Sequence, residues 1–189
     1  ERTSTAPHLN KHVGRILNEV LVEVTPEIHA QATDSQSTDL ATGFAKLFSA
    51  VRSHIDPNKA HEAQQTLSEG GDFTTFLECE LAQCAADITR PADDSSETDR
   101  ATYASRQLSL SRCLAASGRR DEALTTAQEA TNLYRTLVEH NPAAYTPNLA
   151  TSLNNLASYL DSNGQQREAL TTAQEAVTIR RNLVEHNPA

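Results

Sequence analysis

Apolar residues in the second half of the chain recur at helical spacing. One stripe consists of Leu149, Leu153, Leu156 and Leu160. Asn163-Gly164 then interrupts the pattern, and glycine suits the left-handed conformation that often follows the end of a helix. A second stripe consists of Ala169, Leu170, Ala173, Ala176, Val177, Ile179 and Leu183. Spacings of three and four residues place each stripe on one helical face, so the pattern predicts two antiparallel helices, at 147–163 and 166–186.

The ends of these two helices carry residues with known positional preferences. We expect Thr146 to cap the first helix and Pro147 to occupy its first position, where the missing N–H is not needed. Pro188 should end the second helix, because the residue before a proline avoids the helical conformation. Ala169 and Ala176 should be buried, since small side chains allow two helices to approach closely.

A very similar pattern lies 46 residues earlier in the chain. Residues 122–130 are identical to 168–176. Aligning 101–143 with 147–189 without a gap gives 21 identities at 43 positions. Self-similarity at a fixed period is the signature of a repeat architecture. The second half therefore reads as two tandem helix–turn–helix units, at about 97–143 and 147–189.

The spacing around the two inter-helix glycines resembles that of the tetratricopeptide repeat. Around Gly164, the positions where that family carries apolar or small residues hold Leu153, Leu156, Ala157, Ala169, Ala173 and Ala176. The equivalent positions around Gly118 hold Gln107, Leu110, Ser111, Ala123, Ala127 and Ala130. Gln107 and Ser111 depart from the pattern, so the first unit is the less regular one. The resemblance implies an all-α fold, a right-handed solenoid of antiparallel helix pairs, with a protein or peptide partner bound on its concave surface.

The period of 46 residues points to a long-repeat subtype, since the usual tetratricopeptide period is about 34. Long second helices and the run at 153–157 (Leu-Asn-Asn-Leu-Ala) resemble the kinesin-light-chain type of repeat. Such arrays are similar to those found in large bacterial signalling proteins, beside nucleotide-binding switch domains or proteases.

In the family that this chain resembles, the first helix of each unit lines the concave groove. The candidate partner-binding residues on these helices are Ser105, Leu108, Arg112, Thr151, Asn154, Asn155 and Ser158. An asparagine amide both donates and accepts, so it can bond a peptide backbone without reading its side chains. A surface asparagine without any partner is the alternative interpretation.

The first half of the chain shows no match to the repeat, yet it also reads as helical. Apolar stripes predict helices within 9–21, 40–55, 57–67 and 73–88, followed by a polar linker at 89–96. We expect residues 1–96 to form diverged helical hairpins that cap the array, with a separate helical bundle as the alternative.

The last three residues, 187–189, repeat 141–143, which lead into another helix. We therefore expect further repeats after Ala189. Because a solenoid needs a polar terminal cap, the apolar residues near this end also predict self-association.

The charge and the cysteine content limit which binding partners and which cellular compartment are expected. The net charge is −9, whereas nucleic-acid binding needs a basic face. No apolar run is long enough for a membrane span. The three cysteines are an odd number without metal-site spacing, which indicates reduced thiols in the cytoplasm.

No catalytic, cofactor or metal site is predicted. Phosphate-cradling loops need clustered glycines, but only Gly70-Gly71 are adjacent. His61-Glu62 begins like a zinc-protease motif, and Gln65 stands where its second histidine should be. His8 and His12 are spaced for a shared metal but lack a nearby third ligand. We favour a protein-binding scaffold over a regulatory arm of a larger switch protein, and over catalysis within these residues.

Overall fold

The computed structural model describes residues 56–58, 60–61 and 72–186. The chain divides into two compact units, Glu1–Thr89 and Arg90–Ala189, and each is treated by itself. The helices predicted within 9–21 and 40–55 lie outside the described residues, as does the histidine pair His8 and His12.

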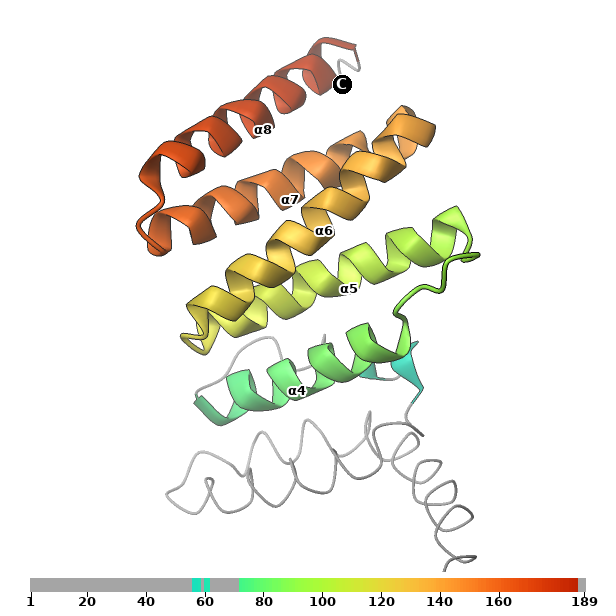
Figure 1. The fold of residues 1–189 in the computed structure, drawn as a ribbon, viewed down its shortest axis with the longest axis vertical. Coiled ribbons are helices and arrows are strands. Elements are labelled where there is room, and N and C mark those ends of the chain that lie inside the picture. The colour runs from blue at the N-terminus through green and yellow to red at the C-terminus, as the bar shows by residue number, and fades with distance from the viewer. Residues whose placement is uncertain (1–55, 59, 62–71, 187–189) are drawn as a thin grey trace, which may run out of the picture. The chain divides into compact units, whose positions relative to one another are not determined.

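Helix α4, Asp72–Ile88, is the long described helix of the first unit (Figure 1). It matches the helix predicted at 73–88. Leu81, Cys84 and Ala85 are buried, as their shared face predicts. Ile88 was expected on the same face but is 39% exposed, because it is the last residue of the helix.

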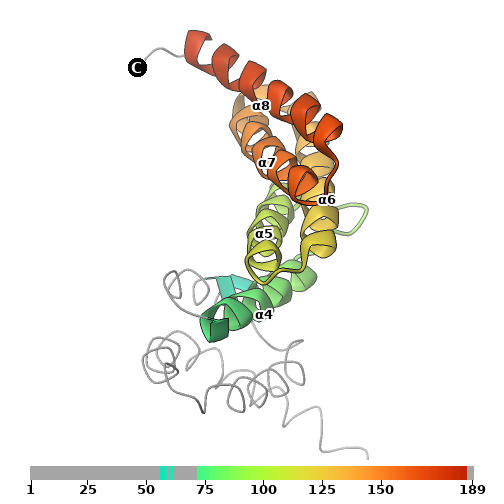
Figure 2. The same ribbon diagram turned by 90° about the vertical axis from the view of Figure 1, so that its left-hand side faces the viewer.

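The second unit is all-helical from residue 97 to residue 186. Its helices are α5 (Glu97–Ala116), α6 (Arg120–His140), α7 (Pro142–Ser162) and α8 (Gln166–His186). Each helix packs against the next one along the chain, so that α5–α6 and α7–α8 form stacked pairs (Figures 1 and 2). No strand occurs among the residues described in this unit. The predicted all-α arrangement of adjacent, packed helix pairs is confirmed.

Both helix pairs turn at a glycine with a left-handed backbone. Gly118 has φ 77° and Gly164 has φ 78°. After each glycine the next amide reaches back to a leucine carbonyl, Arg119 to Leu114 and Gln165 to Leu160, both at 2.9 Å. These bonds satisfy carbonyls that the helix end leaves open. The two turns are therefore the same structure repeated, as the sequence predicted.

The start of α7 differs from the prediction. The helix begins at Pro142 rather than Pro147, and Asn141 is its cap, with the side-chain oxygen accepting from the Ala144 amide at 3.3 Å. Asn141 also ends α6, since its amide donates to the Leu137 carbonyl at 2.9 Å. Pro142 takes the first helical position, where proline is favoured.

Thr146 and Pro147 consequently lie inside α7. The Thr146 hydroxyl donates to the Pro142 carbonyl at 2.5 Å instead of capping the helix. Pro147 cannot donate to the Ala143 carbonyl, but Ala143 is exposed and water can bond its oxygen. The break is tolerated because it lies close to the helix start and faces solvent.

Alanines and leucines form the core between the helices. One cluster comprises Ala104, Tyr134, Leu137, Leu149, Leu153 and Ala176. A second comprises Ala127, Leu156, Leu160 and Ala169. Ala169 and Ala176 are buried, at 7% and 3% exposed, as predicted from the need for close approach.

The two positions that depart from the repeat pattern are also buried. Gln107 is 5% exposed and donates to the Tyr103 hydroxyl and, at 3.3 Å, to Glu129 of α6. Ser111 is fully buried and donates to the Leu108 carbonyl at 2.9 Å. The Ser111 hydroxyl and the Gln107 amide nitrogen thus have hydrogen-bond partners, whereas the Gln107 side-chain oxygen is buried without one.

Substitution of Gly164 tests the turn. Gly164→Ala should lower the free energy of unfolding by about 1 kcal/mol, because an L-residue in the left-handed region is strained. Steric exclusion is not the cause, since an added Cβ would meet nothing within 4 Å. Gly164→Asn should lose less, because asparagine tolerates this conformation. Urea denaturation of the three proteins measures the difference, and equal losses for Ala and Asn would contradict the backbone explanation.

Enlarging a core alanine tests the helix spacing. Ala127→Leu should destabilise the protein by about 1–3 kcal/mol, because Ala127 is fully buried between helices. Its repeat equivalent, Ala173, is only partly buried on α8, so Ala173→Leu should cost much less. Thermal unfolding followed by circular dichroism compares the matched pair. Similar melting temperatures for the two variants would show that close approach at Ala127 is unimportant.

Candidate functional site

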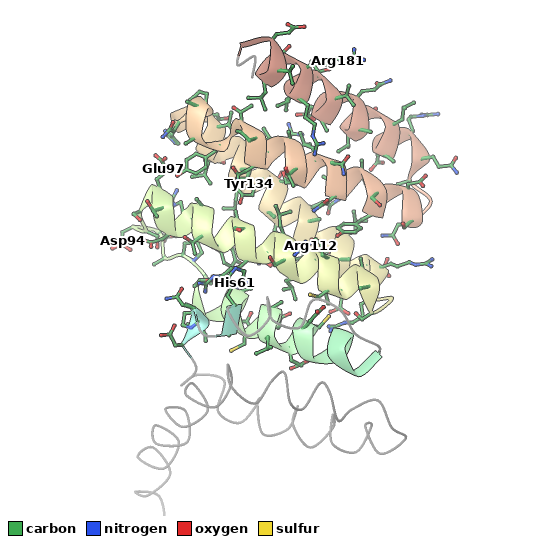
Figure 3. The ribbon with its side chains drawn as sticks, turned by 180° about the vertical axis from the view of Figure 1, so that it is seen from behind. His61, Asp94, Glu97, Arg112, Tyr134 and Arg181 are labelled. Carbon is green, nitrogen blue, oxygen red and sulfur yellow. The ribbon has the colours of Figure 1, made fainter. Side chains whose placement is uncertain are left out.

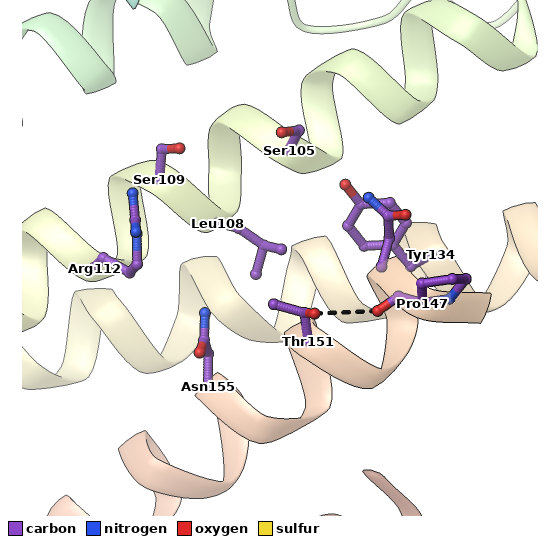
Figure 4. Close-up of a pocket in the computed structure, with 9 residues that line it drawn as sticks. Ser105, Leu108, Ser109, Arg112, Tyr134, Pro147, Thr151 and Asn155 are labelled. Atoms are coloured by element: carbon purple, nitrogen blue, oxygen red, sulfur yellow. Dashed lines mark hydrogen bonds between the residues drawn. The ribbon is translucent and has the colours of Figure 1, made fainter. Parts of the chain in front are cut away.

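A recess of about 310 Å³ lies between the first helices of the two pairs (Figure 4). Its α5 wall consists of Ser105, Leu108, Ser109 and Arg112. Its α7 wall consists of Pro147, Asn148, Thr151 and Asn155. Tyr134 of α6 is the remaining lining residue. We call this feature the α5–α7 recess.

Helical periodicity explains why these residues share a wall. The α5 positions are spaced by three and four residues, which places them on one face. On the other side of α5, Leu110, Cys113 and Leu114 are buried in the core. The α5 wall is therefore fixed by the packing of α5 against its neighbours.

Tyr134 reaches from the second-helix layer to the bottom of the recess. It is 1% exposed, and burial raises the pKa of its hydroxyl, while hydrogen bonding by Asn148 and Ser105 acts in the opposite direction. A buried tyrosine hydroxyl requires such partners. Tyr134 thus joins a residue of α7 to a residue of α5 across the floor of the recess.

Arg112 supplies the only formal charge among the lining residues. Its side chain is exposed and lies near Tyr159 of α7. Burial raises the pKa of the Tyr159 hydroxyl, and hydrogen bonding with Ser111 and the positive charge of Arg112 lower it. A guanidinium in this position can pair with an incoming carboxylate through two parallel bonds.

The rest of the lining is neutral and rich in hydrogen-bonding groups. The Thr151 hydroxyl donates to the Pro147 carbonyl at 3.1 Å (Figure 4), so its lone pairs remain available as acceptors. Asn148 and Asn155 each carry a donor and an acceptor. Leu108 and Pro147 add apolar surface. Such a lining suits an extended peptide, which presents backbone amides and carbonyls together with side chains.

The structure brings together most, not all, of the candidate residues. Those in the recess are Ser105, Leu108, Arg112, Thr151 and Asn155. Asn154 and Ser158 are exposed on α7 and do not line it. The binding role of all these residues stays a prediction.

The position of the recess explains this separation. The sequence assigned the candidate residues to the first helices without fixing which flank of α7 faces α5. The recess lies on the flank of α7 that is turned toward α5, so that Asn155 lines it and Asn154, one residue earlier, does not. Neighbouring residues on a helix differ by about 100° in direction, which is enough to separate them.

Sequence reasoning missed four residues of the recess. They are Ser109, Tyr134, Pro147 and Asn148. Ser109, Pro147 and Asn148 could have been found, because each lies three or four residues from a candidate on the same helix. Tyr134 comes from a second helix, and the only hint in the sequence is a hydroxyl on an apolar helical face.

The described part of the chain brings together no three histidine, cysteine or acidic side chains that could hold a metal ion. Among its helices, none is long and apolar enough to cross a membrane.

The tyrosines allow a test of the recess in solution. Burial raises the pKa of Tyr134, Tyr145 and Tyr159 above the ordinary 10.0. Their neutral forms are therefore favoured by folding, so the associated stability is present below pH 10 and is lost as pH rises through the folded-state pKa values. Tyrosinate absorbance, which is free of tryptophan overlap because the chain has none, should rise at higher pH in the folded protein than in denaturant. Tyr134→Phe should remove part of the high-pH component, and coincident titrations of folded and denatured protein would contradict its burial.

Comparison with known families adds one finding. Residues 149–188 match the family model of the tetratricopeptide repeat. The matched segment covers most of α7, the turn at Gly164, and α8. No curated protein and no solved structure gives a significant match.

Proposed function

We propose, from the tetratricopeptide repeat at residues 149–188, that this chain is a scaffold that binds a peptide or partner protein along its first helices and carries no catalysis of its own. The observation that supports the proposal best is the α5–α7 recess. It is open, lined by both first helices, and composed of hydrogen-bonding groups around a single cation. Repeats of this family are generally associated with protein–protein interaction.

The recess is proposed to hold an extended segment mainly through its backbone. Asn148 and Asn155 can each bond a peptide amide and carbonyl, and Thr151 and Ser105 can accept or donate along the same path. This recognition is largely independent of sequence, because it uses groups that every residue of the ligand carries.

Specificity is proposed to come from Arg112 and Leu108. Arg112 selects a carboxylate on the ligand, and its planar fork gives a geometry that lysine cannot reproduce. Leu108 provides an apolar contact beside it. The ligand is therefore an acidic segment with at least one apolar residue. Asn154 and Ser158, exposed further around α7, are included as outer contacts of the same groove.

The finer assignment of subtype rests on helix length and period. Three of the four helices of this unit have 21 residues and α5 has 20, longer than a 34-residue period accommodates with turns. This length, with the Leu-Asn-Asn-Leu-Ala run at 153–157, supports the long-repeat, kinesin-light-chain-like type known from large bacterial signalling proteins. Cys79, Cys84 and Cys113 are buried thiols, which supports a reducing, cytoplasmic setting. The net charge of −9 supports a protein partner rather than nucleic acid.

A display library of random peptides, selected on the immobilised protein, tests the proposal. Selected peptides should carry an acidic residue next to an apolar one. Arg112→Ala and Asn155→Ala should each weaken binding of a selected peptide by roughly threefold or more, because one lost hydrogen bond costs about 0.5–1.5 kcal/mol and more when charged. Calorimetric titration measures the dissociation constants, and circular dichroism checks that the helices are intact.

Matched controls separate the recess from the general surface. Arg167→Ala and Gln166→Ala remove an arginine and an amide from the exposed start of α8, outside the recess. Both should bind selected peptides as the parent does. If the Arg112 and Asn155 variants also bind like the parent, the groove is not the binding site.

A further inference from the structure

Helix α8 presents an apolar face that the described residues leave open. Leu170, Val177 and Val184 are 60%, 47% and 69% exposed. They are spaced by seven residues, which places them along one side of the helix. Within the second unit, α8 packs chiefly against α7 (Figure 2). Isolated exposed apolar residues are ordinary, but an aligned row of three along one helix indicates an interface.

The repeat identifies what belongs on this face. The equivalent row on α6 is Leu124, Thr131 and Val138, each 46 residues earlier. There, Thr131 is 1% exposed, and Leu124 and Val138 are partly buried. They pack into the two core clusters, alongside the buried leucine stripe of α7, Leu149, Leu153, Leu156 and Leu160. The same face is thus covered on α6 by the next first helix, and open on α8.

An arginine on α6 also has an ion-pair partner, and among the described residues its equivalent on α8 lacks one. Arg135 of α6 donates to Glu175 of α8 at 2.8 Å, joining the second helix of one pair to that of the next. Arg181 stands 46 residues after Arg135, on α8 (Figure 3). Within the described part of the chain, no acidic side chain pairs with Arg181.

The series of second helices extends this relationship by one position. Arg181 is the repeat equivalent of Arg135. The glutamate that would correspond to Glu175 for Arg181 does not occur among the described residues.

We propose that the exposed face of α8 is a docking surface for one further helical hairpin of this repeat type. Its first helix covers Leu170, Val177 and Val184 with a leucine stripe like that of α7. Its second helix places a carboxylate against Arg181. This interaction is distinct from peptide binding in the α5–α7 recess and goes beyond it.

A second copy of the chain cannot cover α8 in the way that α7 covers α6. The leucine stripe that would have to cover α8 is buried within the second unit, with Leu153 fully buried and Leu149 and Leu160 less than a tenth exposed. A second copy therefore has no free α7-type face to offer without unfolding.

Arg180 stands where Tyr134 stands in the earlier repeat. Tyr134 is 1% exposed at the edge of the α5–α7 recess, so a docked hairpin would largely cover Arg180. The docked hairpin therefore has to offer hydrogen-bonding or acidic groups to this guanidinium, because burying it unpaired would be costly.

The test extends the intact chain by a copy of residues 144–189 placed directly after Ala189, which continues the period of 46. The copy supplies both the leucine stripe and a glutamate equivalent to Glu175. The extended protein should melt at a temperature higher by about 4 °C or more, in a single transition. Val177→Asp should shift the melting temperature of the parent by less than about 2 °C, because the face is open, and should abolish the gain in the extended protein.

A charge exchange tests the predicted pairing independently of the apolar face. In the extended protein, Arg181→Glu should lower the melting temperature, and changing the glutamate of the copy to arginine should restore it. Arg167→Glu makes the same charge change at an exposed site at the start of α8 and should have little effect. If Val177→Asp prevents the extended protein from folding, this exchange still decides the matter.

Other outcomes would overturn the proposal. An extended protein that melts with the parent, or whose added residues are cleaved by protease while the rest resists, has no docked hairpin. Equal effects of Val177→Asp on the parent and the extended protein would mean the same. If light scattering shows that the parent dimerises and that the added hairpin leaves the dimer intact, a second copy is the occupant instead.

Discussion

The close approach of helices at alanine positions is the constraint on which the second unit depends. Ala104, Ala123, Ala127 and Ala130 have no exposed surface. A side chain that ends at Cβ lets two helices approach until larger neighbours, such as Leu153 and Tyr134, fill the space between them. Because these alanines recur with the period of the chain, successive helix pairs stack in the same way. The recess between α5 and α7 exists because the second helices hold the first helices at this spacing.

The sequence predicted those features of the fold that a single helix or turn determines. The glycine turns, the leucine stripe of α7 and the burial of Ala169 follow from local conformation and periodicity. The start of α7 was missed because Pro142 and Pro147 are both acceptable first residues, and only the cap at Asn141 distinguishes them. The recess could be predicted only in part. Its direction depends on how α5 packs against α7, and the periodicity of apolar residues within a single helix carries no information about that packing.

The two helices of each pair differ in how similar their sequences are between the two repeats. Between the repeats, the second helix and its flanks, 119–143 and 165–189, share 17 of 25 positions. The first helix and its turn, 101–118 and 147–164, share 4 of 18. The similar residues pack and pair, as Arg135 does with Glu175. The dissimilar ones include Leu108 and Arg112, which line the recess, and their equivalents Asn154 and Ser158. Repetition therefore preserves the scaffold, while the surface proposed to contact a ligand varies from pair to pair.

The repeat equivalence explains why Asn154 and Ser158 are exposed on α7. On α5, Leu108 and Arg112 are turned toward the following first helix and line the recess that it helps to form. Asn154 and Ser158 hold the same positions on α7, and they are exposed because no further first helix lies beside them in the described chain. A hairpin docked on α8 would supply that helix and would form a second recess with Asn154 and Ser158 on one wall and Arg180 at its floor. Docking of a hairpin would therefore have two linked effects: it would cover the apolar face of α8, and it would lengthen the groove by one recess.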